Sequence, residues 1–190
     1  EYYLAAGRLL HYKRFDLIID AFLKLGLPLK IVGLGPEFDS LRKRASLLTT
    51  NYSLPTTIQF LGYVSEEKLR ELYAGAKAFI MANEEDFGLV TAEAQACGTP
   101  VIASNVYGLR DSVVHERTGL LVQPNNVLSM ASAMEFMITK TSDRKVFSRN
   151  ARLWAQNYSW DVAASRLYQV IVSELSEAKR GSFAFSPASR

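Results

Sequence analysis

Residues 1–36 of the chain, EYYLAAGRLLHYKRFDLIIDAFLKLGLPLKIVGLGP, decide its fold class. The runs Tyr2–Ala6 and Leu29–Val32 are apolar and have the length of buried strands. Between them, apolar side chains recur on one face of a predicted helix, at Phe15, Ile18, Ile19, Phe22 and Leu25. Gly26 follows where such a helix ends. A buried strand, a helix and a second buried strand form the unit from which parallel sheets are built.

The same alternation continues along the chain. Further apolar runs of strand length lie at Ile58–Leu61, Ala78–Met81, Pro100–Ala103 and Gly119–Val122. Helices are predicted over 37–47 after Pro36 and over 66–74 after Ser65, because proline and serine are common at helix starts. The sequence therefore predicts an α/β fold with a Rossmann-like, doubly wound parallel sheet.

The chain after Pro124 has helical patterning only, over 127–138, 143–158 and 161–176. Apolar side chains near the last segment fall close to helical spacing, at Trp160, Leu167 and Ile171. Such a strip predicts packing in a core or against another domain. Residues 179–190 are polar and small apart from two phenylalanines, so we expect a disordered tail after a domain at 1–178 with a helical end.

Composition limits the classes of protein to which the chain belongs. It has 190 residues, 48% of them hydrophobic, which suffices for one substantial core. Its net charge of +3 is not gathered into a basic stripe, which argues against nucleic-acid binding. There is no run of roughly 18 apolar residues, the first residues lack the basic start and long apolar run of a signal peptide, and the only cysteine, Cys97, needs no oxidising compartment. These features predict a cytoplasmic protein, and the missing initial Met suggests an excised domain.

Ligands of open parallel sheets bind beyond the carboxyl ends of the strands. The loop after the first predicted strand, Gly7–Arg14, offers Arg8 and Lys13 there, with His11 between them. A guanidinium can bind two oxygens at once and an ammonium adds a point charge, so this pair suits a diphosphate. The alternative is a solvated basic loop.

A glycine-containing loop, Gly33-Leu34-Gly35-Pro36, follows the second predicted strand. Glycines let a backbone approach a ligand, and the next helix could offer free N–H groups to an anion. A dinucleotide-binding fingerprint requires a third glycine where this chain has Phe38, which argues against NAD binding.

Acidic residues follow the fourth predicted strand, and residues 86–92 separate Glu85 from Glu93. If a helix begins near Leu89, both carboxylates can face one ligand beside its amino end and accept hydroxyl protons from sugar diols. The N–H groups of Gly88 and Leu89 would then meet a phosphate. One alternative is an acidic turn that only complements the helix dipole. Another is a glycosidase pair, but such carboxylates need no phosphate-binding loop.

Taken in order, these pieces resemble the carboxyl-terminal domain of the GT-B glycosyltransferases, in the large retaining family that includes bacterial mannosyl- and glucosyltransferases. The resemblance extends from Tyr2 to Leu175. The matching pieces are Gly7-Arg8-Leu9 with Lys13 and Phe15-Asp16-Leu17, Ile31–Pro36, Phe60–Val64, Glu85–Glu93 with Phe87-Gly88-Leu89, and Ala96–Ala103.

The resemblance implies a role for each matching residue. Arg8 and Lys13 would grip the donor diphosphate and stabilise it as it leaves, without a metal or other cofactor. Glu85 would hold hydroxyls of the donor sugar and Glu93 the ribose. The other donor-binding residues that it implies are Gly33, Gly35, Tyr63, Val64, Phe87, Gly88, Leu89 and Val90.

Two segments depart from the pattern of that family. Arg14 stands where the family often has glycine, which would crowd or further charge the phosphate loop. Val106–Asp111 replaces a more glycine-rich loop that usually ends in glutamate. This second departure affects one wall of the expected pocket.

The resemblance implies retaining hexosyl transfer from a nucleotide sugar to a glycan or lipid acceptor, as in polysaccharide biosynthesis. GDP-mannose is the favoured donor and a UDP-sugar the alternative. The amino-terminal domain, which carries the acceptor site in this family, is missing, so we expect the chain alone to be inactive. The parent protein could associate peripherally with a membrane. A competing hypothesis is a non-catalytic sugar-nucleotide-binding or regulatory module, and a third is a phosphorylase-like enzyme, for which no pyridoxal-type lysine motif is evident.

Overall fold

The computed structural model describes residues 1–52, 58–139 and 141–181, and these divide into two units, one at Glu1–Ala155 and one that begins at Gln156. The first unit is built on a sheet of 6 strands, which all pair in parallel. The strands are β1 (Tyr2–Ala6), β2 (Leu29–Val32), β3 (Ile58–Gly62), β4 (Ala76–Met81), β5 (Val101–Ser104) and β6 (Gly119–Val122). Their order, β3-β2-β1-β4-β5-β6, confirms the predicted doubly wound α/β fold.

Helices connect these strands, as the alternation predicts. They are α1 (Phe15–Leu25), α2 (Phe38–Tyr52), α3 (Glu66–Gly75), α4 (Leu89–Ala96), α5 (Tyr107–Ser112), α6 (Val127–Thr139) and α7 (Thr141–Ala155). A short 3-10 helix, η1 (His11–Lys13), precedes α1, and another, η2 (Gln156–Tyr158), follows α7. The predicted helix over 143–158 is therefore wrong at its end, because the last three residues tighten into η2.

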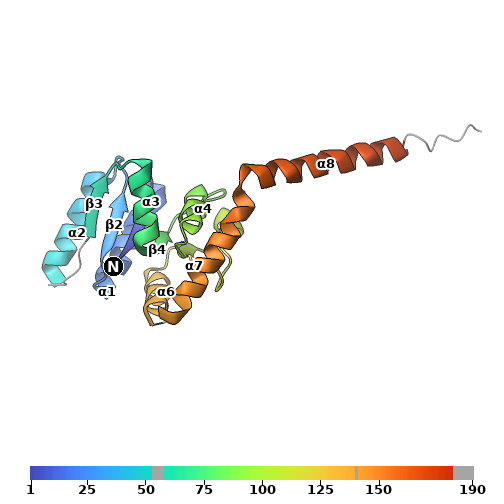
Figure 1. Cartoon of the computed structure of the whole chain (residues 1–190). Coiled ribbons are helices and arrows are strands. Elements are labelled where there is room, and N and C mark those ends of the chain that lie inside the picture. The colour runs from blue at the N-terminus through green and yellow to red at the C-terminus, as the bar shows by residue number, and fades with distance from the viewer. Residues whose placement is uncertain (53–57, 140, 182–190) are drawn as a thin grey trace, which may run out of the picture. The chain divides into compact units, whose positions relative to one another are not determined.

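Figure 1 shows helices packed around the strands of the first unit, and two hydrophobic clusters lie on the two faces of the sheet. On one face, Tyr3 and Ile80 pack in a cluster with α1 and α6, and the ring of Tyr3 meets that of Phe22 edge-on at 5.2 Å. On the other face, Leu4 and Phe79 pack with α3 and α4. Successive strand residues thus point to opposite faces and both are buried, which explains why the strands are continuously apolar.

The second unit begins with η2 and continues as α8 (Trp160–Gly181). The apolar side chains Trp160, Leu167 and Ile171 are exposed on this helix. Helix α8 is described as far as Gly181, and the disordered tail predicted at 179–190 stays a prediction, because residues 182–190 lie outside the described residues. Within the described part of the chain, no helix is both long and apolar enough to cross a membrane.

Candidate functional site

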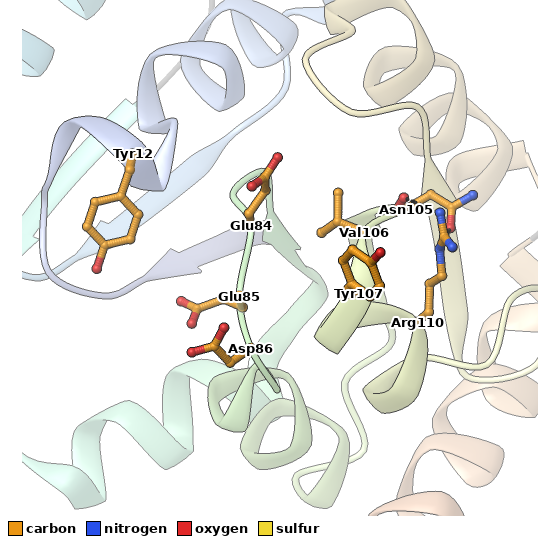
Figure 2. Close-up of a pocket in the computed structure, with 8 residues that line it drawn as sticks. All are labelled: Tyr12, Glu84, Glu85, Asp86, Asn105, Val106, Tyr107 and Arg110. Atoms are coloured by element: carbon orange, nitrogen blue, oxygen red, sulfur yellow. Dashed lines mark hydrogen bonds between the residues drawn. The ribbon is translucent and has the colours of Figure 1, made fainter.

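The order of the strands reverses between β1 and β4, and a cavity opens at the carboxyl edge of the sheet near this point. Its volume is about 500 Å³, within the usual range for small-molecule sites. Figure 2 shows its lining, which comes from η1, the loops after β4 and β5, and α5: Tyr12, Glu84, Glu85, Asp86, Asn105, Val106, Tyr107 and Arg110. A neighbouring cavity of about 270 Å³ shares Tyr12, Glu84 and Val106. Open parallel sheets bind their ligands at this kind of position.

The loop after β1 is held against the loop after β2 by backbone contacts. The N–H of Gly7 donates to the carbonyl of Val32, and that of Leu9 to the carbonyl of Leu34, both at 3.0 Å. Gly33 has φ +133°, and a Cβ added to it would lie 1.9 Å from the carbonyl oxygen of Gly7. A Cβ on Gly35 would lie 2.3 Å from the carbonyl oxygen of Leu9. These glycines are therefore needed for the approach of one loop to the other, and their contact with a donor stays a prediction.

Two N–H groups at the amino end of α2 already have acceptors within the protein. The N–H of Glu37 donates to the carbonyl of Leu9 at 3.1 Å, and that of Phe38 to the carbonyl of Gly35 at 3.1 Å. Leu9 lies in the neighbouring loop and Gly35 in the loop that leads into α2, so these two amides already have acceptors, and an anion site at this helix end stays a prediction.

Arg14, the first departure from the family pattern, has a left-handed backbone and a side chain that pairs within the protein. Its φ of 54° lies in the left-handed region, where glycine is the least strained residue. Its guanidinium pairs with Asp16 at 3.1 Å and donates to Asn125, so its charge is partly compensated. Burial alone would raise the pKa of Asp16, but the hydrogen bond and charge of Arg14 outweigh it and hold that pKa below its usual value.

Lys13 and Glu85 meet across the reversal point of the sheet. The Nζ of Lys13 forms an ion pair with Oε1 of Glu85, and both side chains are largely buried, with 16% and 23% of their surface exposed. Burial lowers the pKa of Lys13. The Nζ also lies 5.2 Å from the centre of the Tyr12 ring. The fold thus brings a cation and a carboxylate that are distant in sequence to the edge of the main cavity.

The loop after β4 holds Glu85 through several contacts. The side-chain amide of Asn83, which is 3% exposed, donates to the carbonyl of Glu84 at 2.7 Å and to Oε1 of Glu85 at 3.0 Å. The carbonyl of Glu85 accepts from the N–H of Gly108 at 3.1 Å. A Cβ on Gly108 would lie 2.2 Å from the backbone of Asp86, so only glycine lets α5 approach this loop so closely.

Helix α4 begins at Leu89, as the sequence predicts, and Gly88 precedes it with φ 74°. Glu93 on α4, the second of the two carboxylates predicted to face the ligand, is exposed and accepts a hydrogen bond from the hydroxyl of Tyr73 at 3.4 Å. Burial first, and the charge of Glu93 second, raise the pKa of Tyr73. Glu93 lines neither of the two cavities described above, whereas Glu85 lines the larger one.

With this geometry in view, comparison with known proteins identifies the family. The family model of the glycosyl transferases group 1 matches residues 1–154. The chain belongs to this family. Its sheet and helices form the carboxyl-terminal half of a GT-B fold, and the chain continues into a helical end.

Three related proteins illustrate the similarity of this glycosyltransferase domain. The D-inositol 3-phosphate glycosyltransferase of Rhodococcus erythropolis is 36% identical over 86% of this chain and 39% of its own length. The sucrose-phosphate synthase of Thermosynechococcus elongatus matches with a TM-score of 0.77 and 30% identity, over 93% of this chain and 46% of its own. The Anabaena protein HepE, in complex with UDP and glucose, matches with a TM-score of 0.75 and 26% identity, over 93% and 48%. The chain thus spans less than half the length of each.

The structure separates the predicted site residues of this glycosyltransferase domain into groups. Lys13 and Glu85 lie together, whereas Arg8 is exposed and lines neither cavity. Tyr63 and Val64 follow β3, at the far edge of the sheet from β6, and Tyr63 is 81% exposed. Around the start of α4, Gly88 is buried, Phe87 and Val90 are half-buried, and Leu89 is exposed. In the described ranges, no group of three or more His, Cys, Asp or Glu side chains could hold a metal ion.

Sequence reasoning missed several residues that line the cavity or support it. The wall that was predicted at 106–111 folds mostly as α5, but the contribution of Asn105 was missed: its side chain accepts from Arg110 at 2.7 Å. Exposed tyrosines could have indicated the lining, since Tyr12 and Tyr107 are polar-tipped aromatic rings in loops that follow strands. Asn83 could have been noticed as a polar residue directly after the apolar run that ends β4.

Proposed function

We propose that this domain binds the nucleotide-sugar donor of a retaining hexosyltransferase at the carboxyl edge of β1 and β4. The observation that carries the proposal is the ion pair between Lys13 and Glu85 at the edge of the main cavity. The diphosphate would take Lys13 as its counter-ion, with Arg8 closing from the exposed side of the same loop. Glu85 would then be released to accept hydroxyl protons from the sugar.

The chemistry of the pair supports this exchange. Burial lowers the pKa of Lys13 because its charge is poorly hydrated. A negatively charged diphosphate therefore stabilises the charged form of this lysine more than that of a solvated lysine. A diphosphate also accepts charge-assisted hydrogen bonds, which are about twice as strong as neutral ones. Such contacts stabilise the leaving diphosphate without requiring a metal.

We favour a UDP-hexose as the donor. HepE is known in complex with UDP and glucose, and neither GDP nor mannose occurs in the names of the three related proteins. The GDP-mannose that the resemblance suggested, and with it mannosyl transfer and a part in polysaccharide biosynthesis, therefore lacks support beyond that resemblance. Lysine and the other charges at the cavity do not distinguish the two bases.

The rest of the parent protein would supply the acceptor site. Because the chain spans less than half of its relatives, we propose that it binds the donor but does not transfer sugar alone. The acceptor would be a glycan or lipid, and a cytoplasmic location with peripheral membrane association stays a prediction. Detection of transfer by the purified domain would contradict this part of the proposal.

Thermal unfolding in the presence of UDP, UDP-glucose, GDP and GDP-mannose tests the proposed function. A ligand at about 100 times its dissociation constant adds roughly 2.7 kcal/mol of stability, which raises the unfolding temperature measurably. We expect stabilisation by UDP and UDP-glucose that Lys13→Ala removes. Equal shifts in wild-type protein and Lys13→Ala would place the ligand elsewhere, and the absence of any shift would favour a module without a working donor site.

A further inference from the structure

Asn83 is buried at the end of β4, next to the residue to which we assign sugar recognition. Its side-chain nitrogen lies 2.7 Å from the carbonyl oxygen of Glu84 and 3.0 Å from Oε1 of Glu85. Both partners are acceptors, so the amide nitrogen and not the amide oxygen must face them. The two hydrogens of this nitrogen match the two acceptors.

Glu85 therefore has two donors on one oxygen. Lys13 reaches Oε1 from the loop after β1, and Asn83 reaches the same oxygen from within the loop after β4 that carries Glu85. If a diphosphate draws Lys13 away, the carboxylate loses its charged partner and keeps the neutral one. Oε2 is then the oxygen that can accept from a sugar hydroxyl.

The position of Asn83 is fixed independently of Lys13. The hydroxyl of Ser104 on β5, itself 2% exposed, donates to the carbonyl of Ala82 at 2.8 Å. This bond ties the backbone just before Asn83 to the neighbouring strand. A neutral amide at this place can orient a carboxylate without competing with Lys13 for phosphate, as a second cation would.

We propose that Asn83 is a positioning residue that holds the Glu85 carboxylate in its sugar-binding orientation when Lys13 moves to the diphosphate. This inference rests on the proposed function of the site. Asn83 should therefore affect how much the sugar adds to binding, and it should not affect the binding of the nucleotide itself.

Calorimetric titration of the full chain with UDP and with UDP-glucose tests the inference. The measured quantity is the ratio of the two dissociation constants, which reports what the sugar adds to binding. In Asn83→Ala we expect UDP affinity within about twofold of wild type and a loss of about tenfold in the sugar contribution, since a hydrogen bond to a charged group has been removed. In the Glu85→Ala background, Asn83→Ala should not lower the sugar contribution further.

Matched variants separate positioning from stability. Thr118 is buried at 2% exposure, its hydroxyl accepts from the N–H of Val114 at 3.0 Å, and it precedes β6 at the amino edge of the sheet, away from the cavity. Thr118→Val should lower the unfolding temperature and leave the ratio of dissociation constants unchanged. If Asn83→Ala does not fold, Asn83→Ser, which keeps a shorter donor, should show a smaller loss in the same direction.

The titrations distinguish a failure of the role of Asn83 from a failure of the proposed donor site. Equal weakening of UDP and UDP-glucose by Asn83→Ala, or an unchanged ratio, would overturn the role of Asn83 and leave the donor site standing. A further loss from Asn83→Ala in the Glu85→Ala background would also overturn it. Binding of neither nucleotide by wild-type protein would overturn the proposed function and this inference together.

Discussion

Replacement of Gly33 by alanine should destabilise the domain more than replacement of Gly7, although both residues have positive φ angles. Gly7 has φ +148° and a Cβ there would meet nothing within 4 Å. Gly33 has φ +133° and a Cβ there would lie 1.9 Å from a backbone oxygen. Gly7→Ala therefore introduces backbone strain alone, and Gly33→Ala introduces the same strain and a clash that no side-chain rotation can relieve.

The magnitudes follow from these two terms. A non-glycine residue held in a sparsely populated backbone region costs about 1–3 kcal/mol, which is the loss expected for Gly7→Ala. Forcing an additional methyl group into a packed contact costs a further ~1–3 kcal/mol. Gly33→Ala should thus lower the free energy of unfolding by about 2–6 kcal/mol, a large part of the 5–15 kcal/mol that is typical of a domain.

Urea unfolding followed by near-ultraviolet circular dichroism measures both losses, with the free energy in water taken by linear extrapolation. The loop that Gly33 contacts also carries Lys13, so Gly33→Ala should weaken UDP binding wherever the protein remains folded. A Gly33→Ala variant as stable as Gly7→Ala would refute the reasoning, because the contact between the two loops would then not require glycine.

Four further predictions concern single side chains. Lys13→Ala should lower affinity for UDP by about 10- to 100-fold, as expected for the loss of a charge-assisted bond, in calorimetric titrations. Thr91→Val should lower the free energy of unfolding by about 1–3 kcal/mol, because the buried Thr91 hydroxyl lies 2.8 Å from that of Ser112, and urea titration measures this loss. Burial raises the pKa of the Cys97 thiol, so iodoacetamide should alkylate it more slowly in folded than in urea-unfolded protein. Burial raises the pKa of Tyr3 from 10.0 to about 12, so the unfolded state ionises first and stability should fall between these pH values, less so in Tyr3→Phe.

The sequence predicted the sheet well because buried parallel strands leave a clear signal. The runs at Tyr2–Ala6, Leu29–Val32 and Gly119–Val122 have the same bounds in the structure. Strand β4 begins two residues earlier than predicted, because Lys77 interrupts its apolar run although its backbone pairs within the sheet. Helix α5 was missed, since six residues are too few to show helical periodicity.

The candidate site could be predicted only in part. The loops that carry Lys13 and Glu85 follow β1 and β4, which are neighbours in the sheet, and the ion pair confirms that the two side chains lie close together. That a ligand binds there, as the general rule for parallel sheets suggests, stays a prediction. Glu93 lines neither of the two cavities at the site and contacts Tyr73 on α3. Residue spacing along α4 cannot reveal this contact with another helix. The glycines at 33 and 35 have a packing role that depends on a loop far away in sequence.

The most direct test of the account is the affinity of Glu85→Ala for UDP, compared with wild type and Lys13→Ala by calorimetric titration. If the diphosphate must take Lys13 from Glu85, removal of the carboxylate frees the lysine. The ion pair of Lys13 and Glu85 is largely buried, so Glu85→Ala should bind UDP more tightly by about fivefold or more while losing the contribution of the sugar. Weaker UDP binding by Glu85→Ala, comparable to that of Lys13→Ala, would contradict the exchange of partners at the centre of the site.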